Sequence, residues 1–284
     1  MGCDSLKSKS FAKICLLTIC LAVCLFSGIK LAGILSEYHK GESEYDSIAE
    51  DFIALPHVPD EEAMTMTGEE EKVSESTAKE QEKVEAAEAE EVASEDIGIT
   101  VDFEKLFEKY PDAVGWLYCE GTPINYPIVQ GADNDYYLNR LPNGEENSSG
   151  SIFLDYRCDK GFGGLNSIIY GHNMKNNSMF GSFDKYRKQS YYEEHPALLL
   201  LTPECNCKIV LIGGFSAKQD DEIAYSFPKT QEDMRKAAEY AMESSDFAAD
   251  ITLPENFRLV TMSTCKGADE EMRYLLVGYL LPVN

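Results

Sequence analysis

The hydrophobic pattern divides the chain into three zones. An almost unbroken apolar run covers residues 14–35, a polar zone covers 36–96, and short apolar or alternating runs fill 97–284. A long apolar run is typical of a membrane-spanning helix, whereas short alternating runs are typical of strands. The pattern predicts a short N-terminal tail over 1–13, one transmembrane anchor, a spacer and one folded domain.

Eight runs in the third zone have the pattern of strands, and clusters of Gly, Pro and Asn separate them. They are residues 114–119, 124–130, 151–155, 167–171, 197–202, 208–216, 258–263 and 274–281. Eight short strands suit a small closed barrel or a sandwich.

Helical periodicity marks four other segments. Residues 101–110 place their apolar side chains on one face, 134–141 and 178–186 are short, and 230–244 is the longest. The longest helix lies between the sixth and seventh predicted strands. The expected fold class is therefore mostly β, with N-terminal helices and a longer helix before strand 258–263.

Lysines before the apolar run indicate its orientation. Lys7, Lys9 and Lys13 precede the run, so the positive-inside rule places residues 1–13 in the cytoplasm and the folded zone outside the cell. Lys30 interrupts the run, but a lysine near the end of a span can extend its side chain to the membrane interface. The alternatives are a cleaved signal peptide and a buried helix of a soluble protein.

The formal net charge of −25 is concentrated in the polar zone. Residues 41–96 contain 20 Asp or Glu and 3 Lys, so this segment alone carries −17. Because its few apolar side chains cannot offset the entropy of ordering, residues 36–96 are expected to form a solvated spacer, disordered or helical. The alternative is a partner-binding helix around residues 74–93. Strong acidity argues against nucleic acid as a partner.

The nine cysteines form two groups. Four lie in or before the anchor, where they serve as small apolar side chains. The five in the folded zone are Cys119, Cys158, Cys205, Cys207 and Cys265. Since five is an odd number, at least one thiol stays unpaired in any set of disulfides within the chain. Cys205 and Cys207 lie in a predicted turn, where zinc would need two further ligands that the sequence does not indicate.

Three residues at predicted strand ends carry the candidate chemistry. Cys265 ends the run 257–265, Arg273 begins the next strand, and His172 follows strand 167–171. A thiolate needs a nearby positive group, and acyl transfer needs a donor for the developing oxyanion. Each residue alone has a structural explanation, as a buried thiol, a turn residue or half of a surface ion pair. Together they predict a nucleophilic site.

Sequence motifs surround these residues and continue upstream. They are residues 168–174 (IIYGHNM), 178–181 (SMFG), 263–265 (STC), 112–117 (DAVGWL), 121–130 (GTPINYPIVQ), 133–134 (DN) with 137–138 (YL), and 150–155 (GSIFLD). Taken together over residues 101–283, they resemble the sortase family, and specifically its class B branch.

The resemblance implies an eight-stranded sortase-type β-barrel and a membrane-anchored cysteine transpeptidase on the surface of Gram-positive bacteria. In such enzymes the cysteine attacks the carbonyl of a Thr in the C-terminal sorting signal of a secreted protein. An amine of a peptidoglycan precursor or of a pilin lysine then releases the thioacyl intermediate. By motif, Cys265 is the nucleophile, His172 the general acid and base, and Arg273 the oxyanion donor. The resemblance implies no metal or other cofactor.

The resemblance also places Asn134, Leu138 and Ser263 in a substrate groove. A helix N-cap, a core leucine and a strand serine explain these residues equally well. Tyr225 is a further candidate for contact with the sorting signal. Two other functions stay open, an extracellular cysteine protease or amidase and an inactive surface-binding module. The sequence leaves open the sorting motif, the acceptor amine, and the choice between wall anchoring and pilus assembly.

Overall fold

The structure is a computed structural model that describes residues 3–55, 98–266 and 269–283. Side chains are described for residues 17–55, 98–264 and 271–283. Contacts within the chain define two compact units, Met1–Asp46 and Ser47–Asn284.

A long helix makes up the described part of the first unit and continues into the second. α1 runs from Cys3 to Phe52, and the part that begins at Leu17 is long and apolar enough to cross a membrane. The side chains of Leu17 and Ile29 are 70% and 72% exposed, which is costly in water and ordinary in lipid. This apolar helix lies where the sequence predicts the anchor.

The second unit begins before the predicted folded domain. α1 continues through residues 36–52, and β1 (Ile53–Ala54) then pairs antiparallel with β2 (Thr100–Val101). Phe52 is buried and packs edge-on against Tyr110, with ring centroids 5.9 Å apart. These contacts join residues of the predicted spacer to the second unit. The helix considered for residues 74–93 lies outside the described residues.

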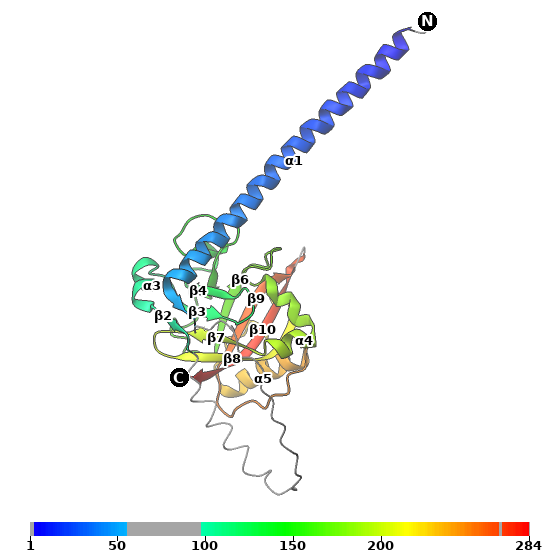
Figure 1. Ribbon diagram of the computed structural model, residues 1–284. Helices are drawn as coiled ribbons and strands as arrows, with labels where there is room; N and C mark the ends of the chain where they lie inside the picture. The colour runs from blue at the N-terminus through cyan, green and yellow to red at the C-terminus, as the bar shows by residue number, and fades with distance from the viewer. Residues whose placement is uncertain (1–2, 56–97, 267–268, 284) are drawn as a thin grey trace, which may run out of the picture. The chain divides into compact units, whose positions relative to one another are not determined.

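Eight strands of the second unit close into a barrel (Figure 1). In spatial order they are β10 (Asp269–Val283), β8 (Asn206–Lys218), β7 (Ala197–Leu201), β3 (Ala113–Tyr118), β4 (Asn125–Val129), β5 (Ile152–Leu154), β6 (Asn166–Gly171) and β9 (Leu259–Lys266). β9 also pairs with β10, which closes the ring. Neighbouring strands are antiparallel except for the parallel pairs β4–β5 and β6–β9. The predicted eight-stranded barrel is confirmed.

Short helices connect or cover the strands. They are α3 (Phe103–Lys109), η2 (Tyr136–Asn139), η3 (Gly181–Arg187), α4 (Gln189–Glu194) and α5 (Gln231–Glu243). α3 begins later than the sequence pattern predicts, because Val101 pairs in β2 and the carboxylate of Asp102 caps the helix by accepting the backbone N–H of Lys105. The sequence pattern misses α4, which is too short for its periodicity to stand out.

Apolar side chains on the inner face of the strands fill the barrel. Trp116, Ile128 and Ile168 are fully buried. The indole N–H of Trp116 donates to Asn125 Oδ1 at 2.8 Å, so the largest buried side chain leaves no unpaired polar atom.

α5 packs against the outside of β8 and β10. Its buried face consists of Met234, Ala238 and Ala241, which belong to one apolar cluster with Phe215 and Leu275. The backbone of α5 approaches β8 so closely that a Cβ on Gly213 would overlap the carbonyl oxygen of Ala241. Glycine at this position therefore allows the helix to lie directly on the barrel.

Gly213→Ala should destabilise the second unit by about 1–3 kcal/mol, because the added methyl group must push α5 away from β8. Gly164→Ala is the matched control, since its Cβ would meet nothing closer than 3.8 Å. Urea unfolding of the full chain in detergent measures both variants. Equal midpoints for the two variants would contradict this packing.

Candidate active site

The register of three adjacent strands aligns the predicted catalytic residues. β6 pairs in parallel with β9, and the last pair is Gly171 with Thr264. Cys265 is the next residue of β9, and His172 follows β6 directly. β9 pairs with β10 so that Cys265 lies opposite Arg273. The backbone thus places all three residues side by side at one end of the barrel, while the side chain of Cys265 lies outside the described residues.

A backbone carbonyl orients the imidazole ring of His172. Its Nε2 lies 2.6 Å from the carbonyl oxygen of Leu138, in η2. Because a carbonyl oxygen only accepts hydrogen bonds, Nε2 must carry a proton and donate it. Nδ1 is therefore the ring nitrogen left for proton exchange. Leu138 thus contacts His172 through its backbone, which the sequence does not predict.

A groove with a volume of about 240 Å³ opens beside these strand ends. Every candidate from the sequence whose side chain is described lines this groove: Asn134, Leu138, His172, Ser263 and Arg273, together with Tyr225. Residues of η2 and its flanks form one side of it, and the segment after β8 contributes another. The structure therefore brings the candidate substrate residues and the candidate catalytic residues to one place.

Five further groove residues are not predicted from the sequence. They are Asp135, Phe153, Tyr170, Gly171 and Gln219. Tyr170 lies in β6 and precedes His172 by two residues, so continued alternation predicts that the two side chains share a face. Gln219 follows β8 and carries no motif, yet its Oε1 accepts a hydrogen bond from Nη2 of Arg273 at 3.3 Å.

Tyr225 fixes the segment after β8 over the groove. Its hydroxyl lies 2.7 Å from Oγ of Ser263, and its ring stacks on that of Tyr170 with centroids 6.4 Å apart. Burial raises the pKa of Tyr225, so the phenol stays neutral at physiological pH. Ser263 thus lines the groove and forms a hydrogen bond with Tyr225, which also lines it.

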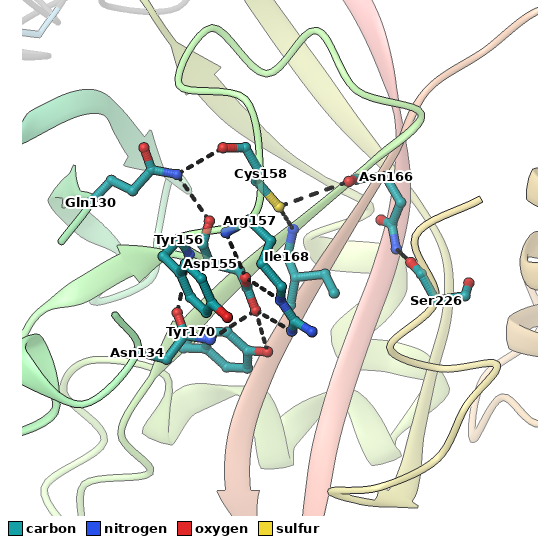
Figure 2. Close-up of polar contacts among 10 residues, drawn as sticks. All are labelled: Gln130, Asn134, Asp155, Tyr156, Arg157, Cys158, Asn166, Ile168, Tyr170 and Ser226. Carbon is teal, nitrogen blue, oxygen red and sulfur yellow. Dashed lines mark hydrogen bonds and ion pairs between the residues drawn. The ribbon is translucent and has the colours of Figure 1, made fainter. Parts of the chain in front are cut away.

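A fully buried carboxylate lies behind the groove (Figure 2). Asp155 accepts Nε and Nη2 of Arg157 at 2.9 and 2.7 Å, Nδ2 of Asn134 at 2.8 Å and the hydroxyl of Tyr170 at 3.1 Å. Burial by itself raises the pKa of Asp155, but the hydrogen bonds from Arg157 and Asn134 outweigh burial and lower the pKa overall. Asp155 is therefore ionised and holds two groove residues.

Three buried or half-buried thiols away from the groove are poor nucleophiles. Burial raises the pKa of Cys158 to about 11 and that of Cys207 to about 12, and it also raises the pKa of Cys119. Sγ of Cys205 lies 3.5 Å from Sγ of Cys207, and both are free thiols. Cys207 lies in β8 and not in the predicted turn, because the strand begins at Asn206 and pairs with β7.

Comparisons with known proteins agree on one family. No model of a protein family matches the chain. Sortase B of Listeria monocytogenes is 34% identical over 183 residues, which cover 63% of this chain and 73% of the relative. The Staphylococcus aureus sortase B–substrate complex superposes with a TM-score of 0.60 at 29% identity, over 64% of this chain and 85% of that one. A crystal structure of sortase B complexed with triglycine gives a TM-score of 0.60 at 28% identity, over 64% and 86%.

The closed eight-stranded barrel of this chain superposes on solved structures of sortases, a family of cysteine transpeptidases. The 34% sequence identity with the Listeria monocytogenes protein is more than a shared fold alone explains, and it extends the similarity to the class B branch of the sortases. The chain belongs to the sortase B family, which confirms the resemblance of its motifs.

Acid should weaken the second unit by protonating Asp155. Its pKa is lowered from the ordinary 3.8 on folding, so its stabilising contribution is complete above about pH 4 and is lost as the pH falls through the folded-state pKa. The gap in unfolding free energy between wild type and Asp155→Asn should therefore be largest near neutral pH and shrink below about pH 4.

Urea unfolding of the full chain in detergent at a series of pH values measures this gap. Asp250→Asn, which changes an exposed carboxylate, is the control and should follow the wild type throughout. A gap for Asp155→Asn that stayed constant down to about pH 2, where most of the contribution should be lost, would show that the carboxylate is not stabilised as described.

Proposed function

We propose that the chain is a membrane-anchored transpeptidase of the Gram-positive cell surface. It cleaves the C-terminal sorting signal of a secreted protein after a Thr, through a thioacyl intermediate on Cys265, and transfers the protein to an amine of a peptidoglycan precursor or a pilin. The observation that carries this proposal is the register that lines up His172, Cys265 and Arg273 beside the groove.

Family membership and the anchor support the proposal. The Staphylococcus aureus relative is recorded in complex with a substrate and another sortase B structure with triglycine, which supports a peptide substrate and an amine acceptor for this chain. The apolar part of α1 supports attachment to a membrane. Lysines on its N-terminal side favour a cytoplasmic N-terminus and a catalytic domain outside the cell.

In the first step, the thiolate of Cys265 attacks the carbonyl carbon of the Thr. Arg273 favours the thiolate and donates hydrogen bonds to the oxyanion that forms, and Gln219 holds the guanidinium in place. The C–N bond then breaks, and the leaving nitrogen takes a proton from Nδ1 of His172, since Nε2 is committed to Leu138. The product is a thioester on Cys265.

In the second step, the acceptor amine attacks the thioester and gives its proton to Nδ1 of His172. The C–S bond breaks, the sulfur leaves as a thiolate, and a new amide joins the protein to the acceptor. Arg273 again stabilises the oxyanion, and its planar fork of donors suits this task better than the single ammonium of a lysine. No step requires a cofactor.

The full chain in detergent micelles, incubated with peptides that contain candidate Thr sorting motifs and with an amine such as triglycine, should form the amide product. Mass spectrometry should find the acyl group on Cys265 before the amine is added. Cys265→Ala should form neither product. Cys205→Ala should keep the wild-type rate, because this thiol lies next to the start of β8, at the opposite end of that strand from Gln219.

Two outcomes would contradict the proposal. Hydrolysis that no added amine diverts would indicate a cysteine protease or amidase. Peptide binding without turnover, unchanged in Cys265→Ala, would indicate an inactive surface-binding module.

A further inference from the structure

Hydrogen bonds within the turn after β5 hold the Asp155 carboxylate in position. The buried side chain of Gln130 donates from Nε2 to the carbonyl oxygens of both Asp155 and Cys158 at 2.9 Å. The backbone N–H of Cys158 also donates to the carbonyl of Asp155 at 2.9 Å. The two bonds from Gln130, drawn in Figure 2, hold the turn at both ends. The carboxylate is therefore fixed in position before any ligand binds.

Asp155 dictates which way its groove partners point. An ionised carboxylate only accepts hydrogen bonds, so Asn134 must turn its amide nitrogen and Tyr170 its O–H toward it. The other end of the Asn134 side chain is fixed as well, since Oδ1 accepts the backbone N–H of Tyr156 at 3.1 Å. The amide of Asn134 therefore has one orientation, and a flip would break both bonds.

Arg157 links this carboxylate to the opposite wall of the groove. Its guanidinium forms a two-point contact with Asp155 and lies 4.4 Å from the ring centroid of Phe227, in the segment after β8. The same segment is attached to β6, because Nδ2 of Asn166 donates to the carbonyl of Ser226 at 3.0 Å. One ion pair thus connects the η2 side of the groove with the segment that carries Tyr225.

The orientation leaves a defined set of hydrogen-bonding groups for a ligand. Asn134 has a second N–H on Nδ2 for which the described part of the chain shows no acceptor, and both Asn134 and Tyr170 line the groove. The hydroxyl of Tyr170 donates its hydrogen to Asp155, so only the lone pairs of its oxygen remain to accept a hydrogen bond from a ligand. A donor from Asn134 and an acceptor from Tyr170 match the C=O and N–H of a peptide group.

We propose that Asp155 is a positioning residue for substrate recognition, which it exerts through Asn134 and Tyr170. With Arg157 it keeps an N–H donor and an oxygen acceptor directed at one peptide group of the bound sorting signal. This role rests on the proposed transpeptidase function, and Asp155 itself is fully buried and does not line the groove. Its loss should therefore weaken peptide binding and leave the nucleophile intact.

The test is a double-mutant cycle measured by peptide transfer with the full chain in detergent. Asp155→Asn should lower kcat/KM by about 10- to 100-fold, mainly through a higher KM, because it removes charge-assisted hydrogen bonds that hold two ligand-binding groups. In a chain that already carries Asn134→Ala and Tyr170→Phe, the same change should cost less than about threefold. Equal losses in the two backgrounds would overturn the proposal, since a merely structural residue acts independently of these partners.

Alkylation of Cys265 by iodoacetamide provides the second readout. Its rate should be the same in wild type and Asp155→Asn, and a parallel fall in alkylation and transfer would overturn the positioning role. If Asp155→Asn does not fold, Arg157→Lys takes its place in the cycle, because lysine keeps the charge and loses the two-point contact. The same two results are expected of it.

The two proposals fail in different ways. Wild-type transfer with an unchanged KM in Asp155→Asn would overturn only the role of Asp155. A wild-type chain that transfers no peptide would contradict the proposed function and, with it, the role of Asp155.

Discussion

Parallel pairing between β6 and β9 is the constraint on which the rest of the site depends. These strands are far apart in the sequence, and their pairing is one of the strand pairings that close the barrel. Since side chains alternate along a strand, a slip of one residue between these strands would change which residue of β9 lies beside His172. The antiparallel register between β9 and β10 likewise determines that Arg273 lies opposite Cys265. Backbone pairing therefore brings the three predicted catalytic residues next to one another.

Side chains around the strand ends then set the chemical state of the site. The carbonyl of Leu138 selects the tautomer of His172, and Gln219 restrains the guanidinium of Arg273. Asp155 acts one layer further back by holding Asn134 and Tyr170. Each of these contacts joins different elements of the fold, so the groove depends on the closed barrel as a whole.

The sequence predicts most of the barrel because strand patterns are short-range signals, and the motifs around His172 and Cys265 point to the groove. It misses α4, which is too short for its periodicity to stand out, and the end of α1, where Phe52 packs against the distant Tyr110. It also misses Asp155, which resembles any acidic residue after a strand until Asn134 and Tyr170 fold against it. Contacts between distant elements leave no local pattern, so they emerge only from the structure.

The most direct test of the account is a disulfide between positions 172 and 265. Neighbouring residues in register lie about 5 Å apart between their Cα atoms, a spacing that a disulfide can bridge. The variant His172→Cys, mildly oxidised and digested, should yield a peptide cross-linked to Cys265 by mass spectrometry, whereas Asn173→Cys should yield none because its side chain points to the other face. Absence of the cross-link in His172→Cys, or equal yields from both variants, would contradict the register.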